Sequence, residues 1–566
     1  MNSQDKKSVL ILGGTGVFGK RLVKHLAQAG GFELIVTSRS EAKAMSLANE
    51  IGEAYPQTKI TGIALEREEN LFETLQTLQP FIVVDCSGPF QTASYDTARA
   101  VLASGAHLID LADARDYLKN FGFELNDLAM ENNVAGLTGA SSTPALSACI
   151  AQHVTKTWQR VDSLDYCITP GGKSEVGQSV IEAILTYVGK QVPLLREGKI
   201  DTTTGWAEVQ HVNVPGLGAR RVAAVETLDA ELLGPKHAVS SHVTFSAGLE
   251  SKIEQWGIET IARLRKLKFF PDPMFLAPAL TWCRKLTRIT TSDKGGMLLQ
   301  AKGLDKDGKF VHHEWSLLAR QDHGPNVPVL AAAALVRKLR IGEVKPGARL
   351  ACEALTLSEI TAETQPYDMS ISESCRFREQ SIYEQKLGRA AFGELPASLK
   401  RFHSDNGEPV WSGRADVETG RGPIAKLITK LFSFPAGGTQ VPVVVTVDRK
   451  LDHKGKRSEH WIRSFAGKRF SSILKTWDDG RFTEQFGPFV FEIDLVVQGQ
   501  TIKMPLTGWR LGPIPLPLFL APQSKTLEFE DDQKRFNFDV RLTLPVIGLL
   551  AHYKGWLEPQ TDSTKI

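Results

Sequence analysis

The sequence predicts an α/β chain in three parts: an N-terminal doubly wound parallel sheet, an α+β second domain and a β-rich, antiparallel C-terminal domain. Three observations support this prediction. Strand-like and helix-like stretches alternate over residues 8–140, which is the pattern of parallel strands joined by helices. From about residue 410, short β segments follow one another between turn residues. A chain of 566 residues is also too long for one hydrophobic core.

The composition is that of an ordinary globular protein, and 67 basic against 64 acidic residues leave a formal charge of +3. This near balance gives no reason to expect a nucleic-acid partner. The six cysteines are scattered, with neither a C-x-x-C pair nor a metal-ligand spacing, which favours a reducing compartment and no metal site. The first apolar run is four residues long, and no run reaches the length of a membrane span, so we expect a cytoplasmic protein.

A glycine turn follows the first predicted strand, residues 9–12, and precedes a predicted helix over 17–29. The turn consists of Gly13, Gly14, Thr15, Gly16, Val17, Phe18 and Gly19. In a G-x-G-x-x-G turn, the glycines permit a tight turn, a close approach to a pyrophosphate and close packing of helix on strand. The N–H groups at the helix start then face the phosphates. The order of strand, turn and helix therefore predicts a dinucleotide site.

The strand and helix pattern continues through the first 145 residues. We expect strands at 33–37, 59–65, 81–85, 107–111 and 134–137, and helices at 41–54, 68–78, 94–104 and 124–132. The strand at 81–85 is almost entirely apolar, as parallel strands covered on both faces are. Ligands of such sheets bind at the carboxyl ends of the strands.

The end of the second strand carries Ser38, Arg39 and Ser40 where an NAD site has an acidic residue for the ribose hydroxyl. A guanidinium and two hydroxyls are instead suited to a 2′-phosphate, so we predict NADP in preference to NAD. The alternative is that Arg39 is a solvated surface residue, or stacks on the adenine of either cofactor.

The end of the fourth strand carries Ser87, Gly88, Pro89 and Phe90 after Cys86. A Gly-Pro turn directly after a buried parallel strand places backbone where the cofactor passes, so we predict that this segment borders the nicotinamide. The alternative is a turn that serves only to reverse the chain.

The glycine turn, Ser38-Arg39, the Asp85-Cys86-Ser87-Gly88-Pro89-Phe90 segment and the stretch 107–112 together resemble the NADP-binding domain of saccharopine-dehydrogenase-like oxidoreductases. The resemblance covers residues 8–145 well and continues more weakly to about 360, through 324–328 and 347–349. It implies a Rossmann domain, a nicotinamide cofactor and a second domain that completes the site. It does not imply saccharopine as the substrate, because many members are uncharacterised and some act on lipids.

Residues 146–362 are expected to form that second, substrate-closing domain. A strand over 161–169, a helix over 176–188 and a hairpin formed by 297–303 and 310–319 indicate an α+β fold.

A basic and aromatic segment, about 252–288, stands out within the second domain. Its basic residues are Lys252, Arg263, Arg265, Lys266, Lys268, Arg284, Lys285 and Arg288, and its large apolar residues include Trp256, Phe269, Phe270, Phe275 and Trp282. This amphipathic hairpin has the composition of an element that binds an anionic membrane surface. The alternative is an ordinary helical hairpin with an apolar core side and a solvated basic side.

The polar stretch 363–380 is predicted to be a linker, and 381–560 the β-rich C-terminal domain. We expect its antiparallel sheet or barrel to enclose or cover an apolar space. The domain resembles an uncharacterised domain found behind saccharopine-dehydrogenase-like halves. The matching segments are 382–388, 434–435, 459–463, 484–488 and 552–557. This resemblance implies no chemistry.

No catalytic residue can be named from the sequence. The Tyr55-x-x-x-Lys59 pair comes too early for a short-chain dehydrogenase. Candidate acids and bases are Asp110, Asp113, Cys86 and Tyr166, each of which also has a structural interpretation.

These observations favour an NADP-dependent oxidoreductase acting on an unidentified small molecule, with a hydrophobic or lipid-like substrate as a hypothesis. One alternative is a non-catalytic lipid- or ligand-binding protein whose nucleotide domain senses redox state. Another is amino-acid metabolism of the saccharopine type, for which no carboxylate-binding arginines are apparent. The substrate, the direction of reaction, the oligomeric state and the role of the last domain stay open.

Overall fold

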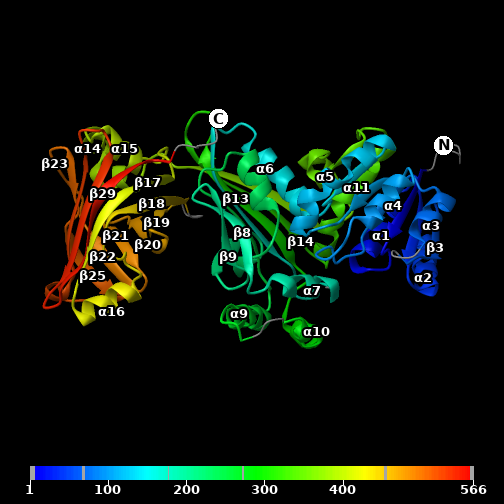
Figure 1. Ribbon diagram of the computed structural model, residues 1–566, viewed down its shortest axis with the longest axis horizontal. Coiled ribbons are helices and arrows are strands. Elements are labelled where there is room, and N and C mark those ends of the chain that lie inside the picture. The colour runs from blue at the N-terminus through cyan, green and yellow to red at the C-terminus, as the bar shows by residue number, and fades with distance from the viewer. Residues whose placement is uncertain (1–6, 67–69, 176–177, 270–272, 452–455, 561–566) are drawn as a thin grey trace.

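The computed structural model describes residues 7–66, 70–175, 178–269, 273–451 and 456–560, and its three sheets lie in a row along the molecule (Figure 1). The first sheet is at one end, the second occupies the middle and the third forms the other end. The predicted fold class is confirmed: a parallel sheet, a mixed sheet and an antiparallel sheet follow in chain order.

The first sheet has seven parallel strands in the order β15-β6-β5-β4-β1-β2-β3. They are β1 (Lys7–Leu12), β2 (Phe32–Ser38), β3 (Lys59–Ala64), β4 (Ile82–Asp85), β5 (His107–Asp110), β6 (Ala135–Thr138) and β15 (Gly347–Leu350). The helices are α1 (Val17–Ala29), α2 (Glu41–Ala54), α3 (Leu71–Leu78), α4 (Asp96–Ala103) and α5 (Arg115–Glu131). The starts predicted for two helices, at 68 and 176, lie outside the described residues.

Alternate residues of β1 belong to two different cores. Val9 and Ile11 pack with α1, whereas Leu10 and Leu12 pack with α3, α4 and α5. Helices therefore cover both faces of the sheet, which explains why these strands are apolar without alternation.

β15 shows that the boundary predicted at residue 145 leaves out part of the first sheet. This strand pairs in parallel with β6, with Gly347 beside Ala135 and Leu350 beside Thr138. The chain thus crosses most of the second domain before it completes the first sheet, and β16 of the second sheet comes later still. The sequence of a four-residue strand is too short to reveal that the strand pairs with another one so much earlier in the chain.

The second sheet runs β10-β11-β12-β7-β13-β14-β16, with β8 and β9 beside β12. Its strands are β7 (Arg160–Thr169), β8 (Gln191–Arg196), β9 (Lys199–Thr204), β10 (Val209–Val214), β11 (Gly218–Ala224), β12 (His242–Ala247), β13 (Gly295–Leu304), β14 (Phe310–Ala319) and β16 (Met369–Phe377). Its helical segments are η1 (Ser142–Leu146), α6 (Ser147–Thr155), α7 (Gln178–Tyr187), α8 (Asp229–Lys236), α9 (Lys252–Lys266), η2 (Met274–Leu276), α10 (Ala277–Thr287), η3 (Arg288–Thr290), η4 (Gly324–Asn326), α11 (Val327–Arg340), η5 (Ala351–Glu353) and α12 (Leu357–Ala362).

The prediction of a linker over 363–380 is wrong. β16 lies within that range and pairs with β14 along its whole length, from Met369 beside Ala319 to Phe377 beside Val311. Most of its residues are exposed, because β16 is the edge strand of the sheet. Its polar composition reflects that edge position and gave no sign of a buried face.

The third sheet has thirteen antiparallel strands in the order β23-β24-β27-β28-β29-β17-β18-β19-β20-β21-β22-β25-β26. They are β17 (Val410–Thr419), β18 (Gly438–Leu451), β19 (Arg457–Phe465), β20 (Lys468–Thr476), β21 (Phe482–Phe486), β22 (Phe489–Ile493), β23 (Val496–Gln498), β24 (Thr501–Lys503), β25 (Leu506–Leu511), β26 (Ile514–Pro515), β27 (Gln523–Glu530), β28 (Phe536–Leu544) and β29 (Gly548–Pro559). The helical segments are α13 (Ile382–Leu387), α14 (Arg389–Gly393), α15 (Ala397–His403), α16 (Pro423–Leu431) and η6 (Leu518–Leu520). Side chains from nine of the strands line one apolar cavity of about 460 Å³, so the sheet curves around it.

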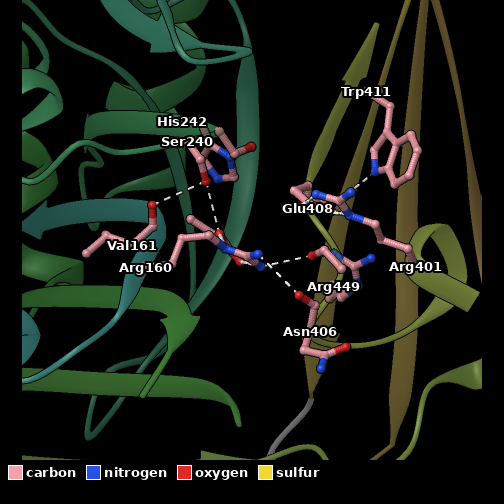
Figure 2. Close-up of polar contacts among 12 residues, drawn as sticks. Arg160, Val161, Ser240, His242, Arg401, Asn406, Glu408, Trp411 and Arg449 are labelled. Carbon is pink, nitrogen blue, oxygen red and sulfur yellow. Dashed lines mark hydrogen bonds and ion pairs between the residues drawn. The ribbon is translucent and has the colours of Figure 1, made fainter. Parts of the chain in front are cut away.

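The second and third domains meet at a polar junction (Figure 2). Arg160 of β7 donates hydrogen bonds to the carbonyl oxygens of Asn406 and Gly407, at 3.2 and 2.9 Å. The Gly407 carbonyl also accepts from Arg449 at 3.1 Å, so two guanidiniums from different domains share one acceptor. Nearby, Lys302 of β13 forms a buried ion pair with Asp448 of β18. These contacts attach the third sheet directly to the second.

Candidate functional site

A cleft of about 920 Å³ separates the first sheet from the second domain. One wall consists of the loops that follow β1, β2 and β4, which meet at the carboxyl ends of the parallel strands. The opposite wall comes from η1, β7, β13, β14 and η4. This is the edge of the sheet at which ligands of doubly wound folds bind.

The glycine turn is built as its spacing predicts. Gly13 adopts a positive φ of 64°, and the Gly14 N–H donates to the Thr37 carbonyl at 3.0 Å, which fixes the turn to β2. A Cβ on Gly19 would come within 2.2 Å of the Gly13 carbonyl oxygen, so α1 packs directly on the turn. A Cβ on Gly16 would meet only that same oxygen, at 3.2 Å, because Gly16 faces the cleft.

The N-terminus of α1 opens toward the cleft. Gly16 is the N-cap residue, and no side chain caps the helix. Gly16, Val17 and Phe18 all line the cleft. Free N–H groups at a helix start form a ready site for an anion, so this cradle fits the pyrophosphate of a dinucleotide.

The end of β2 provides a second anion-binding corner. Ser38, Arg39 and Ser40 line the cleft together, and the Thr15 hydroxyl donates to Ser38 Oγ at 3.1 Å, linking the glycine turn to this corner. Lys43, in the first turn of α2, also lines the cleft. Lys43 was not among the predicted site residues, although its position four residues after Arg39 could have indicated it.

The segment after β4 lies against the glycine turn. A Cβ on Gly13 would be 2.9 Å from Ser87 Cβ, so the two loops are in contact. The Ser87 N–H donates to the buried Asp85 carboxylate at 2.8 Å, and the Ser87 hydroxyl bonds the same oxygen. These bonds orient Ser87 and Pro89 at the cleft wall. Of the fourteen predicted site residues, all except Gly14 and Gly19 line the cleft, and these two support the turn from behind.

Asp110 is fully buried behind the cleft. Its Oδ1 accepts hydrogen bonds from the Thr138 hydroxyl, from the Gly139 N–H and from the Ala112 N–H, at 2.8 to 3.0 Å. Burial raises the pKa of this carboxyl group to about 7. Asp110 does not line the cleft, so it positions the loop that leads from β6 into η1.

The other candidate acids and bases are divided between the cleft and the core. Cys86 lines the cleft, but burial raises the pKa of its thiol, which keeps it protonated. Asp113 also lines the cleft and accepts a 3.1 Å hydrogen bond from Gln91. Tyr166 is buried in the second domain and donates to the Ser147 carbonyl, so its role is structural.

Thr143 and Asp229 form a pair that the sequence analysis did not single out. Thr143 lines the cleft from η1, and its hydroxyl bonds the buried Asp229 carboxylate, which also accepts from Ser147. Burial raises the pKa of Asp229. The two residues are far apart in the sequence, and neither belongs to a recognisable motif.

The second-domain wall of the cleft is largely apolar, and its charged side chain among the described lining residues is Glu175. It includes Ile168, Ala183, Met297, Leu317, Ala319 and Val327. Among the described lining residues, the cationic side chains are Arg39 and Lys43, both at the β2 end. At the mouth, Lys20 of α1 donates to Glu175 of the second domain at 2.7 Å. The positive charge of the cleft lining is therefore concentrated beside the carboxyl end of β2, away from the second-domain wall.

The open N-terminus of α1, the glycine turn and the corner formed by Ser38, Arg39 and Ser40 are arranged as the sequence predicts for a dinucleotide site. Residues 9–140 match the saccharopine dehydrogenase NADP binding domain. Residues 395–557 match a domain of unknown function, DUF4166. The predicted fusion of a saccharopine dehydrogenase NADP binding domain with an uncharacterised C-terminal domain is thereby confirmed.

A curated relative is similar to part of the NADP binding domain. This is 4-hydroxy-tetrahydrodipicolinate reductase of Syntrophomonas wolfei subsp. wolfei, 30% identical over 106 residues, which are 19% of this chain and 36% of the relative. The chain therefore spans about a third of that relative's length.

Two solved structures align with a larger share of the chain. One is a multiply substituted meso-dapdh from Clostridium tetani E88 with DAP, 13% identical, with 64% of this chain and 99% of that chain covered and a TM-score of 0.34. The other is an engineered D-amino acid dehydrogenase bound to NADP+, 14% identical, with the same coverage and a TM-score of 0.35.

Proposed function

We propose that the protein is an NADP-dependent oxidoreductase that acts on a neutral, hydrophobic small molecule. The observation that carries the proposal is that the glycine cradle, Arg39 and the second-domain wall face one cleft of about 920 Å³. The match of residues 9–140 to an NADP binding domain supports the choice of cofactor.

Three parts of the first domain would hold the cofactor. The N–H groups at the start of α1 bind the pyrophosphate, and Arg39 with Lys43 binds the 2′-phosphate. Ser87 and Phe90 border the nicotinamide end. NADP, when bound, supplies or accepts a hydride, and the chain orients the reacting carbon and excludes water from it.

The second-domain wall determines which substrate fits. Because the cationic side chains of the described cleft lining sit at the β2 end, a substrate carboxylate would have no cation beside the nicotinamide end. The apolar wall instead fits a neutral compound with a C=O, C=C or C=N group. This arrangement disfavours amino-acid metabolism of the saccharopine type.

Calorimetric titration with NADPH and NADH tests the cofactor. We expect the wild type to bind NADPH more tightly than NADH, and Arg39→Asp to lose at least tenfold in NADPH affinity through loss of a charge-assisted contact. Lys24→Asp is the matched control, since Lys24 is exposed on α1 and does not line the cleft. Equal binding of NADPH by both variants would contradict the assignment of Arg39.

NADPH oxidation with purified compounds tests the substrate. We expect turnover with neutral, long-chain aldehydes or ketones and none with saccharopine. Turnover with saccharopine and with none of the neutral compounds would contradict a hydrophobic substrate and indicate an amino-acid substrate.

A second candidate is a non-catalytic lipid-binding protein whose nucleotide domain senses redox state. The apolar cavity of the third sheet favours it, since that cavity is separate from the cleft. Tight NADPH binding without turnover on lipid extracts, together with lipid that copurifies with the chain, would support this candidate over the enzyme.

We further propose that the α9–α10 hairpin contacts an anionic membrane surface. The described residues contain no helix with both the length and the apolarity to cross a bilayer. The hairpin nevertheless carries large apolar side chains that are more than half exposed: Ile253, Trp256, Leu267, Phe269, Phe275, Trp282, Leu286 and Ile289. Exposed basic residues accompany them: Lys252, Arg263, Lys266, Lys268, Lys285 and Arg288. Phe270, which was predicted to belong to this hairpin, lies outside the described residues.

The position of the hairpin supports this contact. α9 and α10 project from the lower edge of the molecule in Figure 1, and α16 lies along the same edge of the third sheet. Arg284 links the two helices through a 3.0 Å bond to Glu254, and Arg265 bonds the Val188 carbonyl at 2.8 Å. The apolar side chains are therefore held outward on a fixed support.

Sedimentation with phosphatidylserine-containing liposomes tests the membrane contact. We expect binding at low salt that weakens as salt rises, and a loss of binding in Trp282→Ser. Phe123→Ser is the control, because Phe123 is 92% exposed on α5. Equal losses in the two variants, or no sedimentation at low salt, would contradict the proposal.

A further inference from the structure

The third sheet encloses a cavity of about 460 Å³, which is within the size range of small-molecule sites. Its wall is mostly aromatic and aliphatic and includes Phe434, Phe465, Phe482, Phe489, Trp461 and Trp509. An apolar cavity of this size exceeds the few small voids of an ordinary core. The wall therefore suits a hydrocarbon chain or ring system.

One polar group at the inner end of the cavity has no partner. Tyr383 of α13 is completely buried and lines the cavity, and its hydroxyl makes no hydrogen bond to any described residue. A buried hydroxyl without a partner destabilises the fold, and such groups are rare in native structures. An oxygen atom of a ligand would satisfy it.

The charged residues of the cavity wall, Arg463, Glu484 and Glu528, already have partners within the protein. Arg463 donates to Glu484 at 3.1 Å, and His403 lies 2.7 Å from Glu528. Burial and the carboxylates of Glu528, Glu459 and Glu484 raise the pKa of Tyr383. An anionic head group would meet this excess of nearby carboxylates, whereas a neutral hydroxyl or carbonyl group would not.

The outer end of the cavity lies beneath α16. Ile428 and Leu431 of this helix line the cavity, and Ile424, Leu427 and Leu431 are each more than half exposed to solvent. The helix is thus apolar toward the cavity and also toward the outside. Surface of this kind is typical of an entrance for apolar molecules.

We propose that the C-terminal domain binds one neutral lipid, a long-chain alcohol, aldehyde or ketone, with its hydrocarbon part among the aromatic side chains and its oxygen hydrogen-bonded to Tyr383. This site is separate from the nucleotide cleft and does not depend on the function proposed for that cleft.

Equilibrium binding of radiolabelled 1-hexadecanol to the full chain, with unlabelled hexadecanoic acid as competitor, tests the site. We expect one molecule of alcohol per chain and weaker competition by the acid. Val445→Phe fills the cavity and should weaken alcohol binding at least tenfold. Val444→Phe is the matched control, because Val444 points to the other face of β18. The affinity of this variant for the alcohol should differ less than twofold from that of the wild type.

Tyr383→Phe tests the head-group contact, since it removes only the hydroxyl. Loss of one hydrogen bond corresponds to binding weakened about three- to tenfold. If Val445→Phe lowers the melting temperature, Ser524→Phe at the cavity wall replaces it, with the exposed Lys525→Phe as control.

Any one of four results would overturn the proposal. They are the absence of alcohol binding, equal binding by Val445→Phe and Val444→Phe, tighter binding of the acid than of the alcohol, and an unchanged affinity of Tyr383→Phe. NADPH binding by the same variants should equal that of the wild type, so failure of this site is distinguishable from failure of the nucleotide site.

Discussion

The imidazole Nε2 of His25 and the carboxylate Oε2 of Glu363 lie 2.6 Å apart, and both side chains are almost completely buried. His25 belongs to α1, the helix that starts at the glycine turn, whereas Glu363 directly follows α12 of the second domain. Arg337 of α11 adds a bond to the same carboxylate at 2.6 Å. The orientation of α1 is therefore set by the second domain, which forms the opposite wall of the cleft.

Breaking this pair should destabilise the joined first and second domains. We expect Glu363→Gln to lower the free energy of unfolding by on the order of 3 kcal/mol, because a buried partner is left uncompensated. Glu175→Gln removes the exposed pair with Lys20 and should cost less than about 1 kcal/mol. Urea unfolding followed in both variants measures the difference. Similar losses would show that the buried pair has no special role.

Two glycines of the turn should respond differently to alanine. Gly19→Ala should both destabilise the protein and abolish NADPH binding, because its Cβ would clash with the Gly13 carbonyl. Gly16→Ala should leave the melting temperature within a degree or two but weaken NADPH binding at least tenfold, since its Cβ projects into the cleft. Calorimetry and thermal unfolding of each variant measure these effects. Unchanged binding by Gly16→Ala would place the pyrophosphate elsewhere.

Asp110 should make stability fall as pH rises. Its pKa is about 7 in the folded protein against 3.8 in the unfolded chain, so the folded state holds more protons between these values. The resulting loss is on the order of 4 kcal/mol when pH rises from about 4 to above 7. Relative to wild type, Asp110→Asn should show a flatter dependence of melting temperature on pH. Asp116→Asn, at an exposed site on α5, should follow the wild type.

The junction of the second and third sheets should loosen when its buried ion pair is broken. Asp448→Asn leaves Lys302 without its counter-charge, so we expect small-angle scattering to report a larger radius of gyration. The nearby cations, led by Lys302, hold the pKa of Asp448 below its ordinary value, so the contribution of this pair is lost only as the pH falls into the acid range. Asp532→Asn, an exposed change in the same domain, is the control. An unchanged radius of gyration would indicate that the hydrogen bonds of Arg160, and not the Lys302–Asp448 ion pair, hold the second and third sheets together.

Local patterns made much of the fold predictable. The strand, turn and helix at the start, the buried β4 and the β13–β14 hairpin each carry their signal within a short window of sequence. The residues that line the cleft from the first sheet could be predicted for the same reason, because each follows a recognisable strand.

Other parts depend on contacts between distant segments and gave no local signal. β16 is polar because it is an exposed edge, and the Thr143–Asp229 contact joins η1 to the start of α8 without a motif in either segment. The β10–β11 hairpin was not assigned, because its exposed residues weaken the alternation. In each case the information lies in the packing partner.

The position of β15 also has a consequence for synthesis of the chain. Until residue 350 has left the ribosome, β6 is an open edge with unpaired backbone groups, although every other strand of its sheet has already been made. The nascent nucleotide-binding domain would thus wait, incomplete, while most of the second domain is translated. A chaperone that shields sheet edges during that interval would raise the yield of native protein more than one acting after release.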